Sequence, residues 1–232
     1  VTVIPTHRRC IRRGRPPRVF ATQAAKREAI TSEVAKMVAA GRAVLIGTPS
    51  VSASEALALR LSQEGLAHRV LNAVQHAQEA EIVKEAGRPG RITIATNMAG
   101  RGTDILLADE VRAAGGLHVI ATEMHTSARI DRQLVGRAAR QGDPGSYQFL
   151  LSLEDELLGS LEPARRTRLQ KQARPNRQGE LPASWVKLFR STQRRLEKLH
   201  IKQRKLLLKQ EREQLKKYKR MGLDPFLELV EN

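Results

Sequence analysis

The sequence predicts an α/β fold: a parallel sheet with helices on both faces, followed by a long amphipathic helix. Two observations support this prediction. Between residues 21 and 160, short apolar runs alternate with segments of helical periodicity. Such alternation is typical of a parallel sheet that binds ligands at the carboxyl ends of its strands. From Trp185 to Tyr218, apolar residues recur at helical spacing among lysines and arginines.

The elements follow from local signals in chain order. A strand-like run opens the chain at Val1–Ile4. Residues 22–40 show helical spacing and are followed by Gly41, a residue suited to end a helix. An apolar run at 43–46 predicts a strand, and Ser52 with Glu55 forms a capping-box pattern for a helix. The same reasoning predicts strands at 69–71, 91–95, 117–121 and 147–152, and helices at 77–86 and 129–139.

Composition divides the chain into four parts. Residues 1–20 form a basic N-terminal segment with the first strand, and residues 21–160 form the globular domain. Residues 161–184 are rich in Arg, Gln, Pro and Gly, which predicts a linker. Residues 185–232 hold the long basic helix and a C-terminal tail. Because the chain begins abruptly at a valine, we expect it to be part of a longer protein.

The net charge of +17 suggests nucleic acid or an anionic membrane as a partner. However, the excess lies in residues 1–20 and 185–220, and the domain between residues 21 and 160 is nearly neutral. One cysteine allows no internal disulfide, so a reducing cytosol is expected. No apolar run approaches the roughly 18 to 20 residues of a membrane span.

The first motif, TIATNMAGRGTDI at residues 93–105, begins as a strand and breaks into a glycine-rich loop. Two glycines around Arg101 allow a tight turn, and Asp104 follows. The arginine is suited to a phosphate, and the carboxylate to a ribose hydroxyl or a metal-bound water. Taken alone, the motif is equally compatible with a glycine-rich turn that carries a surface ion pair.

The second motif, QLVGRAARQGDPG at residues 133–145, predicts that Arg137 and Arg140 share one face of a helical turn. Adjacent guanidinium groups repel each other unless an anion lies between them, and a triphosphate is a suitable anion. A solvated basic helix face is the alternative. Gly136 argues against it, because glycine inside a helix costs about 1 kcal/mol and usually marks a close approach.

Together with GLHVIATEMHTSARIDRQLVGRAARQGDPGS and FLLSLEDELL, these motifs resemble the second nucleotide-binding domain of the SecA family, the ATPase motors of bacterial protein export. The resemblance runs from Val3 to Leu158 and, more weakly, over Thr192–Leu207, where it is similar to the start of the family's scaffold helix. It implies a RecA-like fold of the superfamily 2 helicase C-terminal type. The chain departs from the family at Val74, where a lysine is expected, and in its linker.

The resemblance also implies roles for individual residues. In the family, ATP with Mg²⁺ lies between two RecA-like domains, and the first of them carries the Walker motifs. Because the present chain has no GxxxxGK[ST], we expect it to be the second of these domains, which faces the Walker-bearing domain across the bound ATP. The Mg²⁺ ligands are then expected from the missing domain. By position in the motifs, Arg137 and Arg140 are catalytic finger or sensor arginines. Nucleotide contacts are expected from Arg101, Gly102, Asp104 and Gln141.

The implied partners are a Walker-bearing domain in the same protein, a preprotein, the translocation channel and the anionic membrane surface. The implied location is cytoplasmic, peripheral at the inner face of the cell membrane. Two alternatives remain: a superfamily 2 nucleic-acid helicase or binding module, and an ATPase-inactive regulator. With so few aromatic residues for stacking, nucleic acid is not the expected partner.

Other polar residues are given structural roles. No metal site within the chain is expected, because His118 and His125 have no further ligands at suitable spacing. Glu154, Asp155 and Glu156 are interpreted as acids at a helix start, with no partner base.

Overall fold

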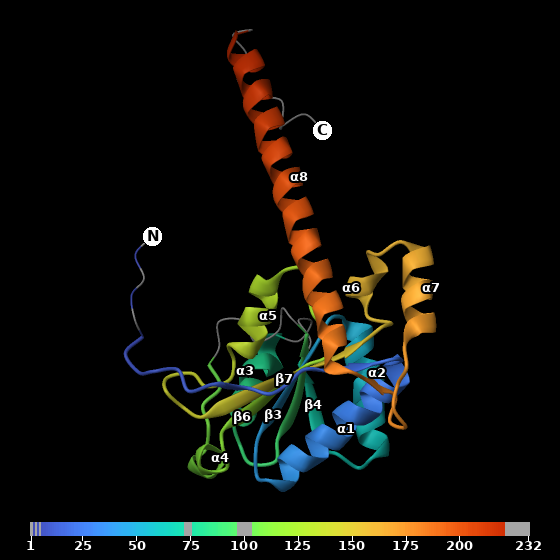
Figure 1. The fold of residues 1–232 in the computed structure, drawn as a ribbon. Coiled ribbons are helices and arrows are strands. Elements are labelled where there is room, and N and C mark those ends of the chain that lie inside the picture. The colour runs from blue at the N-terminus through green and yellow to red at the C-terminus, as the bar shows by residue number, and fades with distance from the viewer. Residues whose placement is uncertain (1, 3, 5, 72–75, 97–103, 221–232) are drawn as a thin grey trace. The chain divides into compact units, whose positions relative to one another are not determined.

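The computed structural model describes residues 2, 4, 6–71, 76–96 and 104–220. Contacts divide the chain into two units, residues 1–193 and residues 194–232. The described part of the first unit contains one sheet with the strand order β4-β5-β3-β6-β7-β2-β8, and β1 also pairs with β7 (Figure 1). All pairings are parallel except that of β2 with β8. The predicted parallel α/β sheet is therefore confirmed.

The strands are short, as their apolar runs predicted. Their bounds are β1 (Arg13–Gly14), β2 (Arg18–Phe20), β3 (Val44–Thr48), β4 (His68–Leu71), β5 (Ile92–Thr96), β6 (Leu117–Ala121), β7 (Gly145–Ser152) and β8 (Glu180–Leu181). The central strands β3 and β6 are buried at every position. Burial on both faces explains why these strands read as continuous apolar runs.

Helices cover both faces of the sheet (Figure 1). On one face, α1 (Gln23–Ala39) and α2 (Val51–Gln63) pack on a core that includes Ile30, Val34, Leu57 and Leu61. On the other face lie α3 (His76–Glu85), α4 (Asp109–Ala113) and α5 (Ala128–Val135), whose core includes Ile82, Val83, Val111 and Ala138. The second sequence motif, at residues 133–145, begins in α5 and thus follows a helix of the second face.

Several elements differ from the prediction. The described residues of the Val1–Ile4 run are not in a strand, and the first strands are β1 and β2. Helix α2 is capped by Ser50, whose hydroxyl accepts from the Ala53 N–H at 3.2 Å, so the Ser52 capping box was wrong. The cap lies two residues earlier because Ser50 is the last extended residue before the helix.

The segment expected as a linker contains regular structure. Following α6 (Glu156–Gly159), α7 (Pro163–Gln172) precedes β8, and a 3₁₀ turn at Ala183–Trp185 leads into α8 (Val186–Arg220). β8 is held by a bidentate ion pair in which Arg18 donates to Glu180 at 2.7 and 2.9 Å. Polar side chains thus support a strand that the local composition did not predict.

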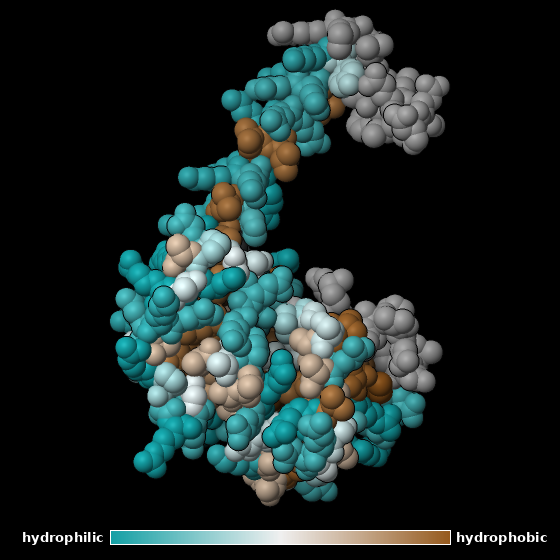
Figure 2. All heavy atoms as spheres, turned by 90° about the vertical axis from the view of Figure 1, so that its right-hand side faces the viewer, coloured by the Kyte–Doolittle hydropathy of each residue, from teal (hydrophilic) through white to brown (hydrophobic). Residues whose placement is uncertain are grey.

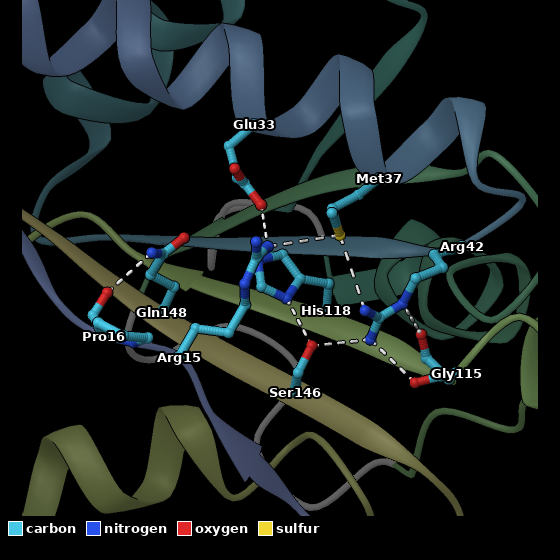
Figure 3. A network of polar contacts seen from close by, with 10 residues as sticks. Arg15, Pro16, Glu33, Met37, Arg42, Gly115, His118, Ser146 and Gln148 are labelled. Atoms are coloured by element: carbon cyan, nitrogen blue, oxygen red, sulfur yellow. Dashed lines mark hydrogen bonds and ion pairs between the residues drawn. The ribbon is translucent and has the colours of Figure 1, made fainter.

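A polar network joins the N-terminal segment to the sheet beneath α1 (Figure 3). Arg15 pairs with Glu33 of α1. Arg42 donates to Ser146 Oγ at 2.8 Å, and Ser146 Oγ lies 2.8 Å from His118 Nδ1. Burial, followed by the nearby charges of Arg42 and Arg15, lowers the pKa of His118 to about 3. This histidine is therefore neutral and structural, as predicted.

A second polar network corrects part of the interpretation of Asp155. The residue stands at the start of α6, as predicted, but the expectation that it has no partner base is wrong. Lys26 Nζ donates to Asp155 Oδ1 and, at 2.8 Å, to the Thr122 carbonyl. Asp155 also accepts from Gln23 Nε2 at 2.9 Å and from the Ser152 N–H at 2.8 Å. The partner base comes from α1, which lies 129 residues earlier in the chain and gave no local signal.

Helix α8 begins in the first unit, where Val186, Phe189, Thr192 and Gln193 are buried. In the second unit, apolar side chains are interspersed among charged ones along the helix (Figure 2). The large exposed apolar residues there are Leu199, Ile201, Leu206, Leu207 and Leu208. No helix in the described ranges has the length and apolar character needed to cross a bilayer.

Candidate functional site

Three of the predicted site residues converge, although they come from two separate motifs. Arg140 Nη1 donates to Asp104 Oδ1 at 3.0 Å, and Gln141 Nε2 donates to Asp104 Oδ2 at 2.8 Å. Arg140 Nε also donates to the Gly136 carbonyl at 3.1 Å. The carboxylate of Asp104 is thereby held between a guanidinium and a carboxamide.

The backbone that presents Arg140 is not helical, which corrects the expectation of a shared helical face. Helix α5 ends at Val135, and Gly136 is its C-cap residue. Ala139 and Gln141 then have positive φ values of 55° and 53°. Because this turn reverses the chain, Arg137 and Arg140 do not lie on one helical turn. Gly136 marks the end of a helix rather than a close approach in its middle.

The converging residues line a cavity of about 400 Å³. Its walls are formed by Arg8, Asp104, Ile105, Leu106, Arg112, Arg140, Gln141 and Asp143. Arg112 and Asp143 precede the starts of β6 and β7, and they pair at 3.1 Å. The cavity thus lies near the starts of these strands and not at their carboxyl ends, because α5 returns the chain toward the beginning of β7.

Arg8 is a cavity residue that the sequence analysis did not single out. Its guanidinium donates to the Gln141 carbonyl at 3.5 Å, and its side chain packs against Gly142. Gly142 has a φ of +85°, and a Cβ there would lie 2.8 Å from Arg8 Cδ. A residue with a side chain would be strained at this φ and would displace the side chain of Arg8. The contact spans 133 residues, so no local pattern predicted it.

The remaining site predictions are less directly placed. Arg137 is half-buried and is not among the residues that line the cavity. Arg101 and Gly102 lie outside the described residues. Leu134 of α5 packs onto β3 at Gly47, where a Cβ would lie 2.3 Å from Leu134 Cδ2. This close packing holds the helix that leads into Arg140 against the sheet.

The Arg140–Asp104 pair is open to exchange with a ligand. The two side chains are 37% and 34% exposed. Ion pairs with this exposure contribute at most about 1 kcal/mol, so breaking one for a better anion costs little. A guanidinium is well suited to bind a phosphate, and a carboxylate or carboxamide to bind a hydroxyl. The donor set therefore fits the phosphate and sugar of a nucleotide.

The donor set does not by itself fit a metal ion. Across the described ranges, no three His, Cys, Asp or Glu side chains gather in a way that could hold one. Asp104 is already engaged by two donors.

The class of protein follows from the fold. Over 63% of this chain, the structure matches 79% of a chain in the crystal structure of the E. coli DEAD-box protein SrmB bound to RraA, with a TM-score of 0.50 and 22% identity. The fold is that of a RecA-like helicase domain. A family model described as the SecA P-loop domain matches residues 9–112 and 107–177. The chain belongs to the SecA family.

Relatives agree with this assignment. "Protein translocase subunit SecA 2" of Rhodopirellula baltica is 46% identical over 233 residues, which cover 98% of this chain and 35% of the relative. The Coxiella burnetii "Protein translocase subunit SecA" is 43% identical over 238 residues, which cover 90% of this chain and 26% of the relative. The chain thus spans about a third or less of the length of these relatives.

Proposed function

We propose that this chain forms one wall of an inter-domain ATP site in a protein-translocation motor. In this proposal, it couples ATP hydrolysis to the movement of a polypeptide. The convergence of Asp104, Arg140 and Gln141 at one cavity, in a chain of the SecA family, carries the proposal. A Walker-bearing domain elsewhere in the full-length protein would supply the phosphate cradle and the Mg²⁺ ligands. Bound Mg²⁺ would neutralise phosphate charge there.

Within this wall, Arg140 would leave Asp104 and bind the transferring phosphate, where its fixed charge stabilises the transition state. Asp104 would accept from a ribose hydroxyl while Gln141 continues to donate to it. Arg101 and Arg137 would add positive charge, and Gly102 would permit the turn. The small cost of breaking an exposed ion pair supports this exchange.

The wider assignment rests on the family. We propose a preprotein as substrate, and the translocation channel and an anionic membrane surface as partners of the whole protein. Its location would be cytoplasmic, peripheral at the inner face of the cell membrane. The names of the relatives as protein translocase subunits support this assignment.

The test is ATP hydrolysis by the full-length protein with Arg140→Ala, which we expect to lower kcat by about 10³-fold or more. Arg132→Ala is the matched control, because Arg132 is exposed on α5, the helix that precedes Arg140, and does not line the cavity. This 232-residue chain alone should hydrolyse no ATP, since it lacks a Walker motif.

Three results would contradict the proposal. Arg140→Ala turnover equal to that of the Arg132→Ala control would remove Arg140 from the reaction. Failure of the full-length protein to bind nucleotide would favour an inactive regulator. Affinity for RNA or DNA that falls steeply between about 50 and 200 mM salt would favour a nucleic-acid motor.

A further inference from the structure

A compact polar cluster joins α5 to the first turns of α8. Asp131 lies in the first turn of α5, and its Oδ1 accepts from the His125 N–H at 3.0 Å and lies 2.6 Å from His125 Nδ1. Its Oδ2 accepts from Gln193 Nε2 at 2.6 Å. The same nitrogen of Gln193 donates to the His125 carbonyl at 2.7 Å. Three segments of the first unit thus meet at one carboxylate.

Burial makes this cluster specific. Asp131 and Gln193 are 7% and 6% exposed. Both hydrogens of the Gln193 Nε2 amide are used, one on a carboxylate and one on a backbone carbonyl. A buried carboxylate that loses a donor is not compensated by water, so the geometry of Gln193 is tightly constrained.

Helix α5 connects this cluster to the cavity. Asp131 stands at its start, Gly136 ends it, and Arg140 follows on the next turn. The helix has eight residues and a length of about 12 Å, short enough to move as one rigid piece. Its start is tied by the buried carboxylate of Asp131, whereas Arg140 beyond its end is tied by the exposed pair with Asp104.

We infer that Gln193 is a positioning residue. It links α8, through Asp131 and α5, to the turn that carries Arg140. A ligand that draws Arg140 from Asp104 displaces the end of α5, and the buried carboxamide contact carries this displacement into α8. Gln193 is well placed for this role because Arg194, the next residue of the same helix, begins the second unit. The inference rests on the proposed function, since nucleotide is the ligand in question.

The test uses the full-length protein with Gln193→Leu, which removes the donor and retains size and helix propensity. Hydrogen–deuterium exchange of peptides covering residues 186–220 is compared with and without a non-hydrolysable ATP analogue, which retains the transferring phosphate. We expect the analogue-dependent change in exchange to be lost in the variant, while affinity for the analogue stays at the wild-type value. Gln203→Leu makes the same chemical change at an exposed position of α8 and should leave the change intact.

A second set of variants guards against simple misfolding. Gln193→Glu places a second carboxylate against Asp131 and should also abolish the response. Combining it with Asp131→Asn restores one hydrogen bond, in which the new carboxamide at position 131 donates and the new carboxylate at position 193 accepts, and at least part of the response to the ATP analogue should return. A merely structural contact would not show this recovery in a ligand-dependent signal. An identical response in the Gln193→Glu single variant and the double exchange would overturn the inference.

The outcomes separate this inference from the proposed function. If Arg140→Ala removes the response to the ATP analogue but Gln193→Leu leaves it at the wild-type level, the positioning role is wrong and the proposed ATP site stands. If Arg140→Ala changes neither turnover nor the response to the analogue, the proposed ATP site itself fails, and the inference fails with it. Loss of the response in both variants, with normal affinity for the analogue in Gln193→Leu, supports both.

Discussion

Two ion pairs in the first unit use the same chemistry in opposite surroundings. The Lys26 and Asp155 side chains are 6% and 0% exposed, whereas those of Arg140 and Asp104 are 37% and 34% exposed. Asp155 accepts from Gln23 and Ser152 in addition to Lys26. Asp104 accepts from Arg140 and Gln141 beside a cavity.

The difference shows how burial decides what an ion pair can do. Removing one partner of a buried pair leaves the other charge without water, so the pair persists and fixes the fold. An exposed pair is screened by solvent and gives up its partner at little cost. The Lys26–Asp155 pair therefore belongs to the structure, and the Arg140–Asp104 pair is available to a ligand.

The largest effect is expected from breaking the buried pair. Asp155→Ala leaves the Lys26 ammonium without its carboxylate and should lower the free energy of unfolding by about 3–5 kcal/mol. Urea unfolding followed by circular dichroism measures this loss. Glu156→Ala is the control, because it removes a neighbouring exposed acid. Equal losses in the two variants would show that burial does not distinguish these carboxylates.

A pH experiment extends the comparison to His118, which is fully buried beside Arg42 and Arg15. Its pKa is lowered from 6.5 to about 3, so between these values the unfolded chain takes up a proton that the folded chain does not. Its contribution to stability is complete above pH 6.5 and is lost as the pH falls. Between pH 7 and pH 4 the loss should be roughly 3 kcal/mol.

The measurement is the free energy of unfolding of the wild type and of His118→Asn across this pH range. Asparagine does not titrate and keeps a polar atom near the position of Nδ1. Glu123 acts in the opposite direction, because burial raises its pKa to about 6 and favours the folded state as the pH falls. It is present in both proteins, so the difference between the two curves isolates His118. Parallel curves would contradict the prediction.

The sequence predicted more of the fold than of these contacts. The apolar run at 43–46 and Gly41 before it were local signals, and β3 lies at Val44–Thr48. Arg140 and Asp104 were associated only through a family resemblance, since their contact spans 36 residues. The contact of Arg8 with Gln141 spans 133 residues, and that of Lys26 with Asp155 spans 129. Periodicity reports which face of an element is buried, but not which distant polar group meets it.

The smallest effect on stability is expected at the exposed pair. A double-mutant cycle with Asp104→Asn and Arg140→Gln should give a coupling energy below about 1 kcal/mol, because solvent screens both charges. Nucleotide affinity of the full-length protein should nevertheless fall in each single variant, since each removes a ligand contact that we propose. Urea unfolding and titration with a fluorescent, non-hydrolysable ATP analogue measure the two quantities on the same samples. A coupling energy as large as the loss in Asp155→Ala would mean that Arg140 is held too firmly to be exchanged. The proposed movement of this arginine onto phosphate would then be wrong.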